Sequence, residues 1–386
     1  MPRSRAAAGA RVPASLALGL AVSAWPAVAV AHGAFPLDAP SLVTLILGWH
    51  FEATIVIPLA FAALGWFVLA RRIRRGHPDT PVPLRRSAAF YGGLAAIAVA
   101  LLSGVERYDD TLFSLHMVQH LLLVLVAAPL IALAAPITQL LRAASPRVRN
   151  RVLLPILHST PVAVMGHPVV AWLAFAIILW GSHFSPLFNL ALEDRGVHDL
   201  EHALYLVSAL LFWWPVVGLD PSPRRMGYPA RVLYLLSQLP LNSFLGMAIL
   251  FAQAPLYPHY ATLGSPYGIT ALADQEAAGG IMWLGGDIAF IAALLAIVAA
   301  WMRHDQRDAP AAERRADAQR ARLRERADEL ARTRAGVSPA PAVATTAAAI
   351  ATTAPAANQP GSGDILGPMA SGASPRSSES ERRRAC

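Results

Sequence analysis

Long apolar runs restrict this chain to a helical membrane protein. Seven stretches are long enough to cross a bilayer as α-helices of about 20 residues, and polar loops separate them. Only 15% of the 386 residues are charged and 55% are hydrophobic, with a mean hydropathy of +0.45. The sequence predicts an all-α fold, a polytopic membrane helix bundle. We expect spans near residues 44–70, 87–105, 115–136, 168–189, 199–218, 231–252 and 280–301.

The two ends of the chain differ from its apolar middle. Residues 1–31 have the pattern of a secretory signal peptide: arginines, a short apolar segment, then Ala29-Val30-Ala31 as an A-x-A cleavage pattern. An uncleaved extra N-terminal helix is the alternative. We expect a seven-span membrane domain over 32–302, a charged cytoplasmic helix over 303–336 and a disordered tail over 337–386.

Arginines gather in alternate loops, and the loops between them carry more acidic than basic residues. By the positive-inside rule, this pattern puts the N-terminus outside and the C-terminus in the cytoplasm. A multi-pass protein of the inner (plasma) membrane is therefore expected. The arginine-rich segments are 71–86, 137–167, the loop with Arg224 and Arg225, and the segment after 301.

Charge and cysteine content exclude two classes of function. The net charge is +8 and the chain has no lysine, but its arginines lie in loops and the tail, which suits membrane topology better than nucleic-acid binding. The single cysteine is Cys386, so intramolecular disulfides and cysteine-based zinc sites are excluded.

Histidines gather at one side of the predicted membrane domain. His116 and His120 open the third span one helical turn apart, so they share a face, and His198 and His202 repeat this spacing in the fifth span. A single interfacial histidine is usually only a polar anchor, but imidazoles at matched depth on several helices can build a metal or haem site. The other histidines on this outer side are His50, His183 and His259.

The donor types favour a soft metal. Imidazole, with Met117 and Met282 as sulfur donors, suits copper first and zinc second, rather than magnesium or calcium. We expect Glu201, Asp274 and Gln119 to orient the imidazoles as supporting partners. The predicted ligands are His116, His120, His198, His202, His183, His50 and Met117.

Two further residues disturb the apolar spans. Pro129 lies inside the third span and should kink it, because proline lacks the N–H that a helix interior needs. Asp287 lies inside the seventh span, where a carboxylate is costly unless it is paired.

Several motifs resemble the CtaG-type assembly factors of caa3 cytochrome c oxidase. Over residues 45–302, the order and spacing of these motifs are similar to that family. The sequence departs from the family near His183, which usually has an aromatic residue directly before it and a proline closer behind. The main matches are FSLHMVQHLL at 113–122, HDLEH at 198–202, LFWWP at 211–215, and DQ at 274–275 with GGIMW at 279–283.

The resemblance implies a multi-span protein, not an enzyme, that is needed to make active haem–copper oxidase. It would help copper reach its site, and its partners would be oxidase subunits or other copper chaperones. One alternative is a haem-binding electron-transfer protein, which needs two facing imidazoles such as His120 and His202. Another is a copper transport or resistance protein, although the mid-span residues are mostly Leu, Val and Ala.

Overall fold

A computed structural model describes residues 36, 38–222 and 224–336. Within these residues the secondary structure is helical, without strands, in agreement with the predicted all-α fold. The predicted signal segment 1–31 and the predicted tail 337–386, including Cys386, lie outside the described residues.

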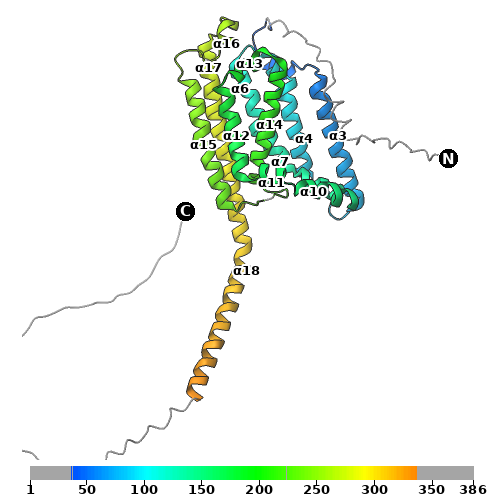
Figure 1. Cartoon of the computed structure of the whole chain (residues 1–386), viewed down its shortest axis with the longest axis vertical. Coiled ribbons are helices and arrows are strands. Elements are labelled where there is room, and N and C mark those ends of the chain that lie inside the picture. Colours follow the sequence, from blue (N-terminus) through cyan, green and yellow to red (C-terminus); the bar gives the residue numbers. More distant parts are fainter. Residues whose placement is uncertain (1–35, 37, 223, 337–386) are drawn as a thin grey trace, which may run out of the picture. The chain divides into compact units, whose positions relative to one another are not determined.

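The spanning helices form an upright bundle (Figure 1). Six helices are long and apolar enough to cross a membrane, and a seventh span results if one bent helix pair is included. This agrees with the predicted membrane fold of seven spans. The six are α3 (Ala53–Gly76), α4 with α5 (Leu84–Leu102, Gly104–Tyr108), α6 through α8 (Phe113–Leu121, Ala128–Ala134, Pro136–Ala143), α14 (Arg195–Val217), α15 (Tyr228–Leu250), and α17 with α18 (Ala271–Gly280, Gly286–Gly336).

The bent pair occupies the place of the predicted fourth span. The break lies between α12 (Pro168–His183) and α13 (Pro186–Glu193), and the two helices meet at 70°. Pro186 begins α13, where its missing N–H costs no helical hydrogen bond. The remaining short helices are α2 (Leu42–Leu47), α9 (Pro146–Val148), α10 (Leu154–Leu157), α11 (Thr160–Met165) and α16 (Pro258–Thr262), with a π-helical turn at Arg149–Leu153 and a 3₁₀ turn at Pro266–Gly268.

The predicted start of the first span is wrong. Residues 42–47 form the separate helix α2, which ends at Gly48, and the span proper begins at Ala53. A Cβ on Gly104 would lie 2.6 Å from the Leu45 Cα, so α2 packs closely against α5. This contact holds the N-terminal turn against the second span.

The third span accommodates Pro129 with a wider helical turn. A π-helical segment at Leu122–Ala127 precedes α7, and Pro129 falls in the first turn of α7. The indole Nε1 of Trp213 donates to the Val124 carbonyl in this segment at 2.9 Å. The next break is at Ala135, which has a left-handed backbone (φ 55°) between α7 and α8.

The seventh span starts earlier than the predicted residue 280. Helix α17 begins at Ala271, and a π-helical turn at Ile281–Gly285 joins it to α18. A Cβ on Gly279 would lie 2.5 Å from the Leu250 backbone nitrogen, so α15 and α17 approach closely there.

Asp287, the charged residue predicted to need a partner in this span, is hydrogen-bonded. Its carboxylate accepts from Asn242 Nδ2 at 3.2 Å and from Ser243 Oγ at 2.7 Å, both on α15. Hydrogen bonds of this kind offset the cost of a carboxylate in a spanning segment.

The described residues from Arg314 onward belong to a separate unit. Its described residues, 314–336, are helical and almost entirely exposed, and Arg320 pairs with Asp317 at 2.9 Å. The charged composition of this segment fits a solvated helix.

Candidate metal centre

Two helices bring the predicted histidine pairs together. His116 and His120 on α6 have ring centroids 4.3 Å apart, and His198 and His202 on α14 have centroids 4.2 Å apart. Across the helices, His116 lies 5.4 Å from His198 and His120 lies 5.7 Å from His202. The spacing of one turn gives each helix a two-imidazole face, and the two faces meet.

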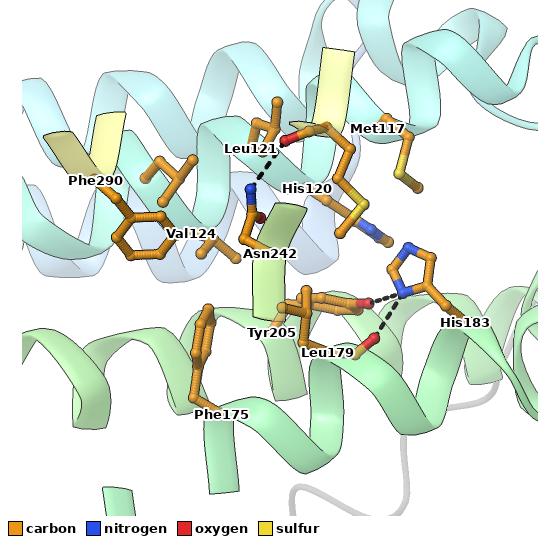
Figure 2. A pocket seen from close by; sticks show the side chains of 12 residues that line it. Met117, His120, Leu121, Val124, Phe175, Leu179, His183, Tyr205, Asn242 and Phe290 are labelled. Carbon is orange, nitrogen blue, oxygen red and sulfur yellow. Dashed lines mark hydrogen bonds between the residues drawn. The ribbon is translucent and has the colours of Figure 1, made fainter. Parts of the chain in front are cut away.

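His183, at the end of α12, joins these four rings. Its centroid is 6.2 Å from that of His120. Nδ1 lies 2.7 Å from the Leu179 carbonyl and 3.0 Å from the Tyr205 hydroxyl. Dashed lines mark these two bonds in Figure 2. Nε2 has no hydrogen-bond partner in the described chain. We call His116, His120, His183, His198 and His202 the imidazole cluster.

Glu201 and Asp109 add one carboxylate each beside the histidine pairs. Glu201 Oε2 is 3.9 Å from His116 Nε2, and Asp109 Oδ2 is 3.5 Å from His198 Nε2. Asp109 lies in the turn after α5, where burial, reinforced by the nearby Glu106 carboxylate, raises its pKa well above the ordinary value.

These side chains form two groups of three potential ligands. Within each group the ligand atoms all lie within 4.8 Å of one another. Both groups contain two imidazoles and one carboxylate, and every member is buried. The Glu201 set is His116, His120 and Glu201, and the Asp109 set is Asp109, His198 and His202.

Several of these buried polar atoms have no hydrogen-bond partner among the described residues. They include both ring nitrogens of His116 and of His120, and both carboxylate oxygens of Glu201. His116 is 0% exposed and Glu201 is 2% exposed. An unsatisfied buried polar group costs about 1–3 kcal/mol, so a bound cation would remove a penalty that the protein otherwise carries. The donors fit copper or zinc.

Gln119 fixes the orientation of one imidazole. Its Nε2 donates to the Ala100 carbonyl at 3.1 Å and to the Glu106 carboxylate, so its Oε1 is the atom that faces His202 Nε2 at 3.0 Å. His202 Nε2 must then carry the proton, which leaves Nδ1 with the lone pair. A fixed tautomer of this kind is typical of metal-ligating histidines.

Arg195 links this network to the surface. Its guanidinium is 3.0 Å from Glu106 Oε1 and also pairs with Glu52, while Nε lies 3.4 Å from Asp199 Oδ1. A continuous polar chain therefore runs from Glu52 through Arg195, Glu106 and Gln119 to His202.

With this geometry established, comparison with known proteins identifies the family. The model of the family described as cytochrome c oxidase caa3 assembly factor (Caa3_CtaG) matches residues 64–304. The chain belongs to this family. The resemblance found in the sequence is confirmed, and the matched range of this Caa3_CtaG member contains the whole imidazole cluster together with Asp109 and Glu201.

Curated relatives are themselves uncharacterized. The chain is 30% identical over 285 residues to the uncharacterized protein Mb0105 of Mycobacterium bovis, and 29% identical to the uncharacterized protein ML1998 of Mycobacterium leprae. Each alignment covers 72% of this Caa3_CtaG chain but 43% of the relative, so this chain spans less than half of those proteins. No solved structure matches it.

Two further histidines predicted for the outer side, His50 and His259, do not belong to the imidazole cluster. His50, included in the predicted ligand set, instead lies near Glu52 and Glu106, with its Nε2 3.9 Å from Glu52 Oε2. The break between α2 and α3 places it there, so the structure does not bring His50 together with the other predicted imidazole ligands. His259 Nε2 lies 2.9 Å from the Asp110 carbonyl, which gives it a structural contact.

Asp274 contacts the start of helix α6, whereas the sequence predicts that it orients an imidazole. Its carboxylate accepts the backbone N–H of Phe113 at 2.5 Å and of Ser114 at 3.3 Å, at the first turn of α6. It therefore caps the helix that carries His116 and His120, and this cap replaces the predicted direct contact with an imidazole ring.

Met117 lies beside the cluster. It lines a cavity of about 20 Å³ together with His120, His183 and Met282, and Figure 2 shows the labelled side chains around this space. Such a cavity has room for one water molecule or one ion. The two predicted sulfur donors thus face the same space as two of the imidazoles.

Sequence reasoning missed three residues of the site. Glu106 and Asp109 lie in one of the predicted acidic loops between spans, yet they are 7% and 3% exposed. Tyr205, whose ring stacks on His120 with centroids 4.1 Å apart, was not singled out. The available signal was the spacing of Glu106 and Asp109, three residues apart at the end of an apolar span.

Proposed function

We propose that this protein assists the assembly of a caa3-type cytochrome c oxidase by holding copper in the imidazole cluster and passing it on. Membership of the Caa3_CtaG family supports the assembly role. The observation that carries the copper role is the set of buried imidazole nitrogens without hydrogen-bond partners at His116 and His120.

The chemistry of the cluster suits transfer of an ion. Neutral imidazoles bind copper and zinc well, and the neighbouring Met117 and Met282 offer sulfur for the softer Cu(I). A cluster with more donors than one ion needs allows ligands to exchange one at a time. The protein would act as a carrier for copper and not as an enzyme.

The proposed location follows from the loop charges. The arginine-rich loops assign the cytoplasmic side, so α6 begins and α12 ends at the outer face of the inner membrane. Copper would enter and leave the imidazole cluster there, where oxidase subunits or other copper chaperones could reach it.

A variant of the α6 pair tests this function. We expect His116→Ala/His120→Ala to leave oxidase subunits in the membrane while oxidase activity and oxidase-bound copper fall at least tenfold. The control is His77→Ala, in an exposed position after α3. The measurement is the copper content and activity of oxidase purified from each strain. Oxidase with full copper from the double variant would refute the proposal.

The small space around His120 and His202 disfavours the haem alternative. A porphyrin between His120 and His202 would need a slot between the rings, but their centroids are 5.7 Å apart and Gln119 bonds to His202. The cavity that His120 lines holds about 20 Å³, the size of one water molecule.

A further inference from the structure

We propose that the imidazole cluster is a two-ion site, in which the Glu201 set binds one copper ion and the Asp109 set binds a second. This inference rests on the copper-binding function proposed above and adds the number of ions and the division of their ligands. The ligands of the first ion are His116, His120 and Glu201, and those of the second are Asp109, His198 and His202.

The number of donors exceeds what one ion can use. Five imidazoles and two carboxylates, all buried, meet in one part of the bundle. Copper and zinc sites in proteins take about four ligands. A single ion with four ligands would use four of these seven donors, whereas two ions can engage all seven.

Each set has nearly the dimensions of a bound ion's ligand shell. Its three ligand atoms lie within 4.8 Å of one another. Ligands of one tetrahedral ion, with bonds of about 2.0–2.1 Å, lie roughly 3.4 Å apart. Each pair of ligand atoms would have to approach by at most about 1.4 Å to reach this spacing. His183 Nε2, which has no hydrogen-bond partner in the described chain, is free to act as a further ligand.

Charge also favours one cation for each set. Among the described residues, neither oxygen of Glu201 has a hydrogen bond. Asp109 Oδ1 accepts the Asp110 N–H at 2.7 Å, whereas Oδ2 has no hydrogen bond in the described chain and lies 3.5 Å from His198 Nε2. The nearby cation, Arg195, instead pairs with Glu52, Glu106 and Asp199. A buried polar oxygen without a hydrogen bond is costly. Glu201 and Asp109 belong to different sets, so one cation in each set would give these oxygens a partner.

The two sets share helix α14 but divide its side chains. His198 and His202 belong to one set, and Glu201, which lies between them, belongs to the other. The His116 and His198 rings, one from each set, have centroids 5.4 Å apart. Two bound Cu(II) ions would therefore be neighbours and would interact magnetically.

The test is copper stoichiometry with the full-length protein in detergent. Apo-protein is incubated with excess CuSO₄, desalted, and assayed for copper per chain by mass spectrometry. We expect two ions in the wild type, and one in Glu201→Gln and in Asp109→Asn. Glu276→Gln, an exposed carboxylate on α17, is the matched control and should keep two.

Electron paramagnetic resonance gives a second readout. The wild-type Cu(II) signal should account for less than half of the bound copper, because neighbouring ions couple, while each single-set variant should give a signal equal to its bound copper. Variants that do not elute as a single peak in size-exclusion chromatography are replaced by His120→Gln and His198→Gln, one from each set.

The outcomes separate this inference from the proposed function. If the wild type binds one ion and each variant binds none, the two-ion site is refuted and the copper-carrier function remains intact. Two ions that survive in both variants refute the assigned ligands. No copper in the wild type refutes the carrier function itself.

Discussion

The close approach of α15 and α17 gives a quantitative test of how the site is held. A Cβ on Gly279 would lie 2.5 Å from the Leu250 nitrogen and 2.8 Å from the Gly246 oxygen. Both neighbours are backbone atoms, so a side-chain rotation cannot relieve the overlap. The helices would have to separate by about 1 Å to restore ordinary contact, and overpacking of this kind costs about 1–3 kcal/mol.

The neighbouring Gly280 provides the matched control. A Cβ there meets no atom of the described residues within 4 Å, so Gly280→Ala should stabilise the helix by about 0.5–1 kcal/mol through helix propensity alone. Gly279→Ala gains the same propensity but also carries the overlap. The two variants should therefore differ by about 1–3 kcal/mol, with Gly279→Ala the less stable.

The assay is thermal unfolding of the purified protein in detergent, followed by tryptophan fluorescence. A difference of 1–3 kcal/mol corresponds to a midpoint at least about 2 °C lower for Gly279→Ala than for Gly280→Ala. Because Asp274 on α17 caps α6, the copper binding proposed above should also be weaker in this variant. A midpoint for Gly279→Ala equal to or above that of Gly280→Ala would refute the packing argument.

Three further substitutions test single contacts by the same unfolding assay. Asp274→Ala removes the cap of α6 and should cost about 1–2 kcal/mol. Arg195→Gln leaves the buried Glu106 without its cation and should lower the unfolding midpoint, with a modest effect because Arg195 is partly exposed. Trp213→Phe removes the hydrogen bond to the π-helical turn and should cost about 0.5–1.5 kcal/mol, whereas Trp214→Phe should cost less because its Nε1 has no partner among the described residues.

Matched controls exist for the first two substitutions. Glu276→Ala removes an exposed carboxylate from the same helix as Asp274, and Arg107→Gln removes an exposed guanidinium beside Glu106. Midpoints for Asp274→Ala and Arg195→Gln that match these controls would contradict the assigned contacts. Equal loss in the two tryptophan variants would show that ring volume, and not the hydrogen bond, stabilises the turn.

Hydropathy predicts the class of fold but not where the helices break or bend. Apolar length fixes which segments can cross a bilayer, so the all-α bundle followed directly. The separate helix α2 and the 70° bend before Pro186 did not, because both are set by contacts with other segments. Hydropathy gives the length and composition of a span, not the residues on which it packs.

The sequence predicts the two histidine pairs and Glu201 beside them, but it does not predict Glu106 and Asp109. The spacing of His116 with His120, and of His198 with His202, fixes which rings share a helix face. Whether the faces meet depends on how α6 and α14 lie in the bundle, and no local pattern encodes that. Asp109 looked like a loop charge because the sequence does not record its burial.

The π-helical turn at Leu122–Ala127 amounts to one extra residue in the third span. One residue changes the direction of every later side chain by about 100° around the helix axis. The turn therefore sets the direction in which His116 and His120, which precede it, point relative to α7, which follows it. Helix α7 packs against α4 and α14. Deleting a single residue there would preserve the apolar length of the span but turn its histidines away from α14.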